Sequence, residues 1–274
     1  MSQTRRLWWG LGALLVASFS VLLYMGGEIH RAAPPIPEAV VSESGETVFT
    51  RADIETGRTV WQSFGGHQLG SIWGHGALVA PDWSADWLHR EAVTWLDLRA
   101  QREFGKPYVD LAAGEKAKLE AELRPDIRRN GYDDGAKRIT VSNERAQAIA
   151  AVQSHYVSLF GDSADTASLR ETYAMKDNTV DTPEHRRQLA AFFFWTSWAA
   201  VTERTPGEAS YTNNWPYEPL VGNAPTSSNF MWTVFSVLFL IAGVALLGWH
   251  YAVSHGKDEE PKLPLTDPLA QVVV

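Results

Sequence analysis

Two long stretches without a charged residue lie near opposite ends of the chain, and they constrain its fold more than any other feature. Residues 7–25 and 230–251 contain no Asp, Glu, Lys or Arg. At a rise of about 1.5 Å per residue, either stretch can cross a hydrocarbon core of roughly 30 Å as a helix. A helix that is apolar on every face would be unusual in a soluble domain of this size. The sequence therefore predicts two transmembrane helices, at 7–25 and 230–251.

A cleaved signal peptide is the alternative interpretation of the first stretch, because it also begins with basic residues. That interpretation requires a shorter apolar core and a cleavage site with small residues. The alanine pair shortly downstream, Ala32-Ala33, leads directly into Pro34-Pro35, which is a poor place for cleavage. The sequence therefore favours an uncleaved membrane anchor.

Basic residues lie directly before the first stretch. They are Arg5 and Arg6, and Lys and Arg next to a span are retained in the cytoplasm. Two spans bring the chain back to the side on which it began. Residues 1–6 and 252–274 are therefore expected in the cytoplasm, and residues 26–229 on the outer side of the membrane. That outer segment carries the whole net charge of −8, because the charges of the two ends cancel.

The chain contains no cysteine. This excludes disulfides, thiolate zinc sites, iron–sulfur clusters, a cysteine nucleophile and a c-type haem held by thioether bonds. The net acidity argues against a nucleic-acid partner, since phosphates attract clustered Lys and Arg. The sequence also lacks a phosphate-binding glycine motif, a GxSxG elbow and an HExxH zinc motif. Residue chemistry by itself therefore indicates a membrane protein with an outer domain of undefined purpose.

Cap and breaker residues predict that the outer segment is mostly helical. Thr50 and Asp53 form a helix start, and Thr182-Pro183 pairs an N-cap with a proline at the first helical position. Helices are predicted over residues 50–64, 84–104, 114–124, 142–160 and 182–201. The third is expected to end at Pro125, because proline has no N–H to donate.

The segments between these helices are predicted to lack regular structure, with one exception. Residues 32–47 are rich in Pro and Glu and indicate a tether. Residues 65–82 contain many glycines, and residues 205–229 are rich in Pro, Gly and Asn, so both are expected to be loops. Only residues 137–141 have the composition of a strand.

Two groups of side chains in and after the glycine loop could bind a partner. His67, His75 and Asp82 could hold a metal ion, although loop histidines are more often solvated or hydrogen-bonded than ligands. Four tryptophans could form a docking face or a buried stripe of the domain core. These are Trp73, Trp83, Trp87 and Trp95. The residues alone leave both interpretations of the tryptophans open.

Three longer strings carry a resemblance that the short motifs do not. They are GRTVWQS at 57–63, GSIWGHGALVAPDWSADWLHRE at 70–91 and YTNNWPYEP at 211–219. They resemble the quinol-dependent nitric oxide reductases, over nearly the whole chain. In that family a membrane helix, a cytochrome c-like outer domain without its haem and a second membrane helix precede a bundle of further membrane helices. The resemblance implies a mainly α fold, with two transmembrane helices flanking a haem-free cytochrome c-like domain in the periplasm of a bacterial inner membrane.

The bundle of that family carries the chemistry. It holds haem b, haem b3 and a non-haem iron, takes electrons from quinol, and reduces nitric oxide to nitrous oxide in denitrification or detoxification. None of its metal-ligand positions occurs in this sequence, so the resemblance implies a fragment or one product of a split gene. Alone the chain is expected to be inactive and to have a structural role, capping the bundle. Its expected partners are the catalytic bundle, membrane lipid and, indirectly, quinol.

The resemblance also implies how the haem was lost. Cytochrome relatives carry Trp-Gln, then a CxxCH motif, then Pro-Asp. Aligning Trp61-Gln62 and Pro81-Asp82 with them places residues 66–70 at the CxxCH motif, with Gly70 at the proximal histidine. No haem is therefore expected in this chain.

A calcium ion is the one metal that the resemblance implies near this domain. In the family, backbone carbonyls of the glycine loop help to hold it where the domain meets the bundle. The matching carbonyls are those of Gly76 and Leu78, and calcium readily accepts such oxygens. The family often has Tyr where Leu78 stands, so the hydrogen bond of that phenol is lost. An ordinary surface loop is the alternative interpretation.

Two other functions are compatible with parts of the sequence. A two-helix membrane sensor or adaptor with an outer ligand-binding domain has the same topology, but residues 252–274 are too short for a cytoplasmic output module. The related nitric oxide dismutases are poorly separated from the reductases by this half of the protein.

Overall fold

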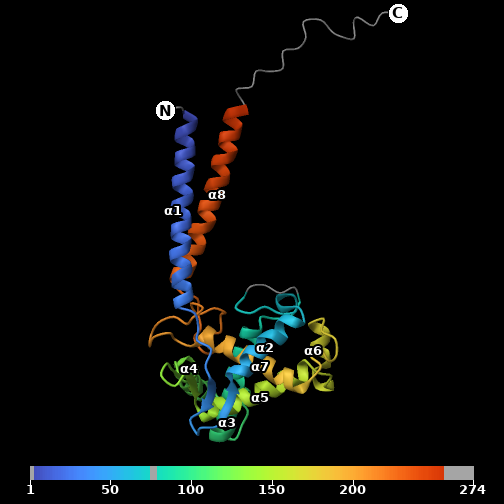
Figure 1. The fold of residues 1–274 in the computed structure, drawn as a ribbon. Helices are drawn as coiled ribbons and strands as arrows, with labels where there is room; N and C mark the ends of the chain where they lie inside the picture. Colours follow the sequence, from blue (N-terminus) through green and yellow to red (C-terminus); the bar gives the residue numbers. More distant parts are fainter. Residues whose placement is uncertain (1–2, 75–78, 256–274) are drawn as a thin grey trace, which may run out of the picture. The chain divides into compact units, whose positions relative to one another are not determined.

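The computed structural model describes residues 3–74 and 79–255. The chain divides into two units, residues 1–225 and residues 226–274. The first contains helix α1 (Gln3–Arg31) and the folded domain that follows it, and the second contains helix α8 (Ser227–His255). In the folded domain, helices gather around α7 beside a small sheet (Figure 1).

Helices α1 and α8 are the two described helices that are long and apolar enough to cross a membrane. The qualifying segments are Thr4–Arg31 and Ser227–Ser254, and the most apolar part of each is entirely unburied. The chain is thus mainly helical, with two candidate membrane helices that flank the folded domain in the sequence, as predicted.

Four short strands form one sheet in the folded domain. They are β1 (Ala39–Ser42), β2 (Thr47–Thr50), β3 (Tyr132–Asp133) and β4 (Arg138–Val141), in the order β2-β1-β4-β3. β1 pairs antiparallel with β2 and parallel with β4, and β3 is antiparallel to β4. The strand predicted at 137–141 is confirmed as β4.

The prediction of a tether over residues 32–47 is wrong. Val40 of β1 lies opposite Phe49 of β2 and Ile139 of β4, and all three side chains are buried. The Trp195 indole donates a hydrogen bond to the Pro35 carbonyl at 2.9 Å, which holds the segment after α1 on the domain. The strand escaped prediction because its four residues show little periodicity and its parallel partner is distant in the sequence.

Side-chain caps begin four of the helices in the domain, and all four helices are predicted by the sequence. Thr50 and Asp53 form a reciprocal capping box at α2 (Arg51–Ser63). The side chains of Asp82, Ser142 and Thr182 cap α3 (Trp83–Phe104), α5 (Asn143–Leu159) and α7 (Pro183–Val201).

Helix α4 (Ala113–Arg128) continues past Pro125, so its predicted end is wrong. The proline removes one donor, but the helix hydrogen bonding resumes where the Arg129 amide donates to the Pro125 carbonyl at 3.1 Å. Burial of Ile127 favours this last turn. The remaining described elements, which the sequence does not predict, are η1 (Gly66–Gln68), η2 (Tyr108–Asp110), η3 (Ala164–Thr166) and α6 (Ala167–Thr172).

The centre of the domain is α7. Every residue from 189 to 201 is buried, and α2, α3 and α5 pack around it (Figure 1). The tryptophans Trp83, Trp87 and Trp95 of α3 are also buried. For these three the core interpretation is confirmed and the docking face is wrong.

Candidate functional site

Asp82 organises the described part of the glycine loop. Its Oδ2 atom accepts hydrogen bonds from the Ser71 hydroxyl, at 2.7 Å, and from the Gly74 amide. Its Oδ1 atom accepts from the Ala85 amide, at 3.0 Å, and from the Ser84 hydroxyl. Two acceptor positions on each carboxylate oxygen are therefore occupied. This use of Asp82 as the N-cap of α3 argues against its predicted role as a metal ligand.

The three predicted metal ligands are not seen together. The His67 ring lies edge-on to the Trp61 indole, with ring centroids 4.8 Å apart. His75 and both calcium candidates, Gly76 and Leu78, lie outside the described residues. Within residues 3–74 and 79–255, no three His, Cys, Asp or Glu side chains are grouped as a metal site would require.

A tryptophan lies where the resemblance places the proximal haem ligand. A Cβ atom at Gly70 would lie only 1.9 Å from Trp83 Nε1 and 2.3 Å from Cε2. The Trp61 indole also donates to the Gly70 carbonyl at 3.3 Å. A histidine at this position would have to displace the fully buried Trp83 ring. The residues present therefore do not fit a haem held from Gly70.

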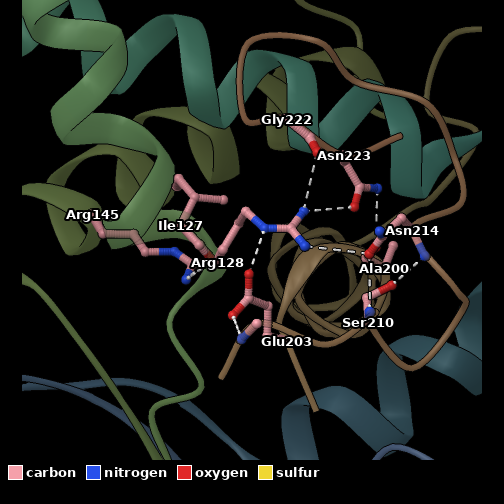
Figure 2. Close-up of polar contacts among 10 residues, drawn as sticks. Ile127, Arg128, Arg145, Ala200, Glu203, Ser210, Asn214, Gly222 and Asn223 are labelled. Carbon is pink, nitrogen blue, oxygen red and sulfur yellow. Dashed lines mark hydrogen bonds and ion pairs between the residues drawn. The ribbon is translucent and has the colours of Figure 1, made fainter. Parts of the chain in front are cut away.

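Arg128, at the end of α4, contacts the loop that follows α7. Its Nε atom donates to Glu203 at 3.1 Å, and Nη1 donates to the Asn223 side chain at 3.2 Å and the Gly222 carbonyl at 3.5 Å. Its Nη2 atom donates to the Asn214 side chain at 3.4 Å. Figure 2 shows the guanidinium pointing into this group of acceptors. We call Arg128 with Glu203, Asn214, Gly222 and Asn223 the Arg128 clasp.

The two asparagines of the clasp also bond to the chain around them. The side-chain Nδ2 of Asn223 donates to the Ala200 carbonyl at 3.1 Å and the Pro216 carbonyl at 2.7 Å, and this side chain is fully buried. The Asn214 side chain accepts from the Ser210 amide at 3.0 Å (Figure 2). These bonds attach the loop to the last turn of α7. The clasp thus holds the string YTNNWPYEP, and Pro225 soon after it directly precedes the unit that contains α8.

A third attachment joins this string to α3. Glu218 is only 9 % exposed, and its Oε2 atom lies 2.9 Å from His89 Nδ1. The other oxygen of the same carboxylate accepts from the Leu220 amide at 3.1 Å. Two of the strings that carry the resemblance, 70–91 and 211–219, are therefore in direct contact.

A buried ion pair contacts the residue that precedes Arg128. Arg145 Nε is 2.6 Å from Glu91 Oε1, and the two side chains are 2 % and 0 % exposed. The Trp87 indole donates to the other Glu91 oxygen at 2.7 Å. Arg145 Nη1 donates to the Ile127 carbonyl at 3.1 Å, as Figure 2 shows. Sequence reasoning missed this pair. The available signal was Glu91 itself, a carboxylate on the tryptophan-bearing face of a predicted helix.

Two further groups titrate far from their ordinary ranges. Burial, aided by the nearby positive charge of Arg90, lowers the pKa of His155 to about 4. Burial and a hydrogen bond to Glu120 raise the pKa of Tyr108 to about 12. His155 is therefore a neutral ring near pH 7.

Comparison with known proteins agrees with the resemblance at the family level. The family model of the NorB cytochrome c-like domain of nitric oxide reductase matches residues 37–217. The match covers the sheet, helices α2 to α7 and most of the Arg128 clasp. No curated protein matches the chain. The chain therefore belongs to the NorB family of nitric oxide reductase, and residues 37–217 form its cytochrome c-like domain.

Proposed function

We propose that this chain is the haem-free outer part of a quinol-dependent nitric oxide reductase. The observation that carries the proposal is the family match over residues 37–217, in a domain where Trp83 occupies the space of a ligand at Gly70. Such a domain has no redox centre of the cytochrome type. Its role is structural: it caps a membrane bundle that holds haem b, haem b3 and non-haem iron, on the same polypeptide or on a second one.

The proposed topology follows from charge and length. Residues 7–25 and 230–251 span the bacterial inner membrane, residues 1–6 and 252–274 are cytoplasmic, and residues 26–229 are periplasmic. Arg5 and Arg6 support this orientation, because basic residues next to a span stay in the cytoplasm. In this arrangement the Arg128 clasp supports the end of the domain that continues directly into α8.

Calcium is proposed as the ion between the domain and the bundle. The carbonyls of Gly76 and Leu78 are the proposed ligands from this chain, since calcium takes backbone oxygens. The hydrogen bonds of Asp82 to Ser71 and Gly74 support the proposal, because they fix the backbone just before these two residues.

The test is purification of the tagged chain from membranes of its source organism. We expect the purified material to contain haem b, either on the tagged polypeptide itself or on one that co-purifies, and to convert nitric oxide to nitrous oxide with a quinol as donor. Turnover by the isolated chain, or the absence of any haem b polypeptide, would contradict the proposal.

A matched pair of variants tests the role of the clasp in this assembly. Arg128→Ala removes the hydrogen bonds to the loop before α8, and we expect it to lower the recovery of the haem b polypeptide. Arg129→Ala is the control, because Arg129 is half-exposed and pairs only with Glu43 among the described residues, at 3.1 Å. Equal recovery with both variants would show that the clasp does not support assembly.

A further inference from the structure

Three oxidisable rings connect the surface of the domain with its interior. Tyr173 is half-buried, and Trp83 and Tyr156 are fully buried. The ring centroids are 5.9 Å apart between Tyr173 and Trp83, and 6.1 Å apart between Trp83 and Tyr156. Tyrosine and tryptophan are the side chains that lose a single electron most readily, apart from cysteine, which this chain lacks. Ring contact lets an electron move between neighbouring members of such a series.

The inner end of the series has a proton acceptor. The Tyr156 hydroxyl donates a hydrogen bond of 2.7 Å to Asp86 Oδ2. Oxidation of a phenol makes it a strong acid, so the electron leaves readily only where a base takes the proton. Asp86, whose side chain is 14 % exposed, provides that base beside the buried phenol, and Arg90, whose Nε is 2.8 Å from the same oxygen, holds the carboxylate in place.

The middle of the series has no such acceptor. The Trp83 indole nitrogen is buried and has no hydrogen-bond partner among the described residues. An oxidised Trp83 would therefore keep its proton and remain a cation in an apolar setting, which is unfavourable. Tyr156 is the next ring inward, and its oxidised form can be neutral. An electron vacancy that enters this series is therefore expected to pass through Trp83 and to become localised on Tyr156.

The phenol of Tyr156 is in its protonated form before any electron is removed. Burial and the nearby negative charge of Asp86 raise its pKa well above the ordinary value. Electron loss and proton transfer at Tyr156 are therefore coupled. The Trp87 ring stacks on Tyr156 with ring centroids 5.3 Å apart, and its own indole donates to Glu91. Tyr156 is fully buried, so the packing around it excludes water from the phenol.

We propose that Tyr156 and Asp86 form a one-electron redox site, reached from solution through Tyr173 and Trp83. An outer-sphere one-electron oxidant takes one electron and is reduced. The Tyr156 O–H bond breaks, its proton moves onto the Asp86 carboxylate, and a neutral tyrosyl radical remains. A one-electron reductant such as ascorbate returns the electron, and the proton moves back. The site thereby takes a single oxidising equivalent from the surface of the domain and returns it to a reductant without covalent damage.

The test uses the full chain in detergent with photogenerated tris(bipyridine)ruthenium(III) as oxidant, and freeze-quench electron paramagnetic resonance as readout. The wild-type chain should give a neutral tyrosyl signal that ascorbate removes. Tyr156→Phe should lose most of that signal, and the exposed control Tyr217→Phe should keep it. A folded Tyr156→Phe protein with the wild-type signal, or a wild-type protein with no tyrosyl signal, overturns the proposal.

Two further variants keep the test decisive if Tyr156→Phe does not fold. Tyr173→Phe changes only a half-buried hydroxyl, and it should slow the growth of the tyrosyl signal several-fold. Asp86→Asn removes the base and should lower the yield of the neutral radical while the surface route stays intact. Wild-type rate in the first variant and wild-type yield in the second overturn the proposal.

Discussion

Two charge-free helical segments of this chain have opposite surroundings. Residues 189–201 of α7 are buried at every position, whereas residues 230–254 of α8 are exposed at every position. Both segments are apolar around their whole circumference, so composition does not separate them. Their lengths separate them. The charge-free segment of α7 is too short to cross a bilayer, whereas α8 is longer than the bilayer is thick. An apolar helix that cannot span a membrane must be covered by other parts of its own domain.

The covering of α7 depends on close helix contacts within the domain. A Cβ atom at Gly57 of α2 would lie 1.9 Å from the Gln188 carbonyl oxygen of α7, so only glycine permits this approach. A Cβ atom at Gly243 or Gly248 of α8 would meet no other atom within 4 Å among the described residues. Protein packing therefore covers the apolar surface of α7, whereas the described residues leave the apolar surface of α8 uncovered.

The largest expected difference between α7 and α8 is their response to a buried charge. Ala191→Asp places a carboxylate on α7 without a partner, at a cost of several kcal/mol that approaches the usual total stability of about 5–15 kcal/mol. We expect the domain not to fold, as measured by protease resistance and circular dichroism. The matched change in α8, Ala242→Asp, should cost about 2.5–3.5 kcal/mol of membrane insertion and leave the domain folded. Equal damage to the domain by both variants would contradict the distinction.

The ion pair buried beside α7 should give the next largest effect. The Arg145 guanidinium lies over the Phe194 ring at 5.8 Å and neutralises Glu91. Arg145→Met leaves Glu91 buried and unpaired, and we expect a loss of about 3–5 kcal/mol in the free energy of unfolding by denaturant. Adding Glu91→Gln should restore part of this loss. A single variant as stable as the wild type would show that the pair is not needed around α7.

The helix starts provide a smaller and more local comparison. The Thr182 hydroxyl accepts from the His185 amide at 3.2 Å at the start of α7, and the Thr226 hydroxyl accepts from the Asn229 amide at 3.3 Å before α8. Thr182→Ala should lower the unfolding free energy of the domain by about 1 kcal/mol. Thr226→Ala should leave thermal unfolding of the domain unchanged, because α8 belongs to the other unit. A larger effect of Thr226→Ala would reverse this assignment.

The effect expected to be smallest near pH 7, and to grow only as the pH falls, is a pH dependence that only the domain should show. The pKa of His155, on α5 beside α7, is lowered from 6.5 to about 4. Below its ordinary pKa the unfolded chain binds a proton that the folded domain excludes, so stability is retained above pH 6.5 and falls between pH 6.5 and 4. His155→Gln should flatten this slope in thermal unfolding curves. An unchanged slope would show that other groups cause the acid sensitivity.

Local signals predicted most of the helices of this fold. The capping box at Thr50 and Asp53, and the Thr182-Pro183 start of α7, act within one helical turn, so the sequence alone reveals them. Pro125 shows where a local rule fails, since burial of Ile127 sustains the helix beyond it. The strand β1 was missed for the same reason, because its stability comes from pairing with β4 and from burial of Val40.

The candidate site could be predicted only in part. The sequence identified the strings 70–91 and 211–219 and the position of Gly70, but contained no indication that Trp83 packs against that glycine. It also did not place Arg128 among the loop residues 203–223, nor pair Glu91 with Arg145. Each of these contacts joins residues from separate helices or loops, and no local pattern encodes them.

By itself the sequence determined the two apolar stretches, the helix starts and the absence of cysteine, because each depends on residue type and close spacing. Only the tertiary structure shows which helices cover α7, that residues 39–42 form a central strand and that Arg128 holds the loop before α8. The two kinds of feature differ in the distance along the chain over which their interactions act. Caps and apolar runs act over a few neighbouring residues, whereas burial, strand pairing and buried hydrogen bonds require partners that only folding brings together.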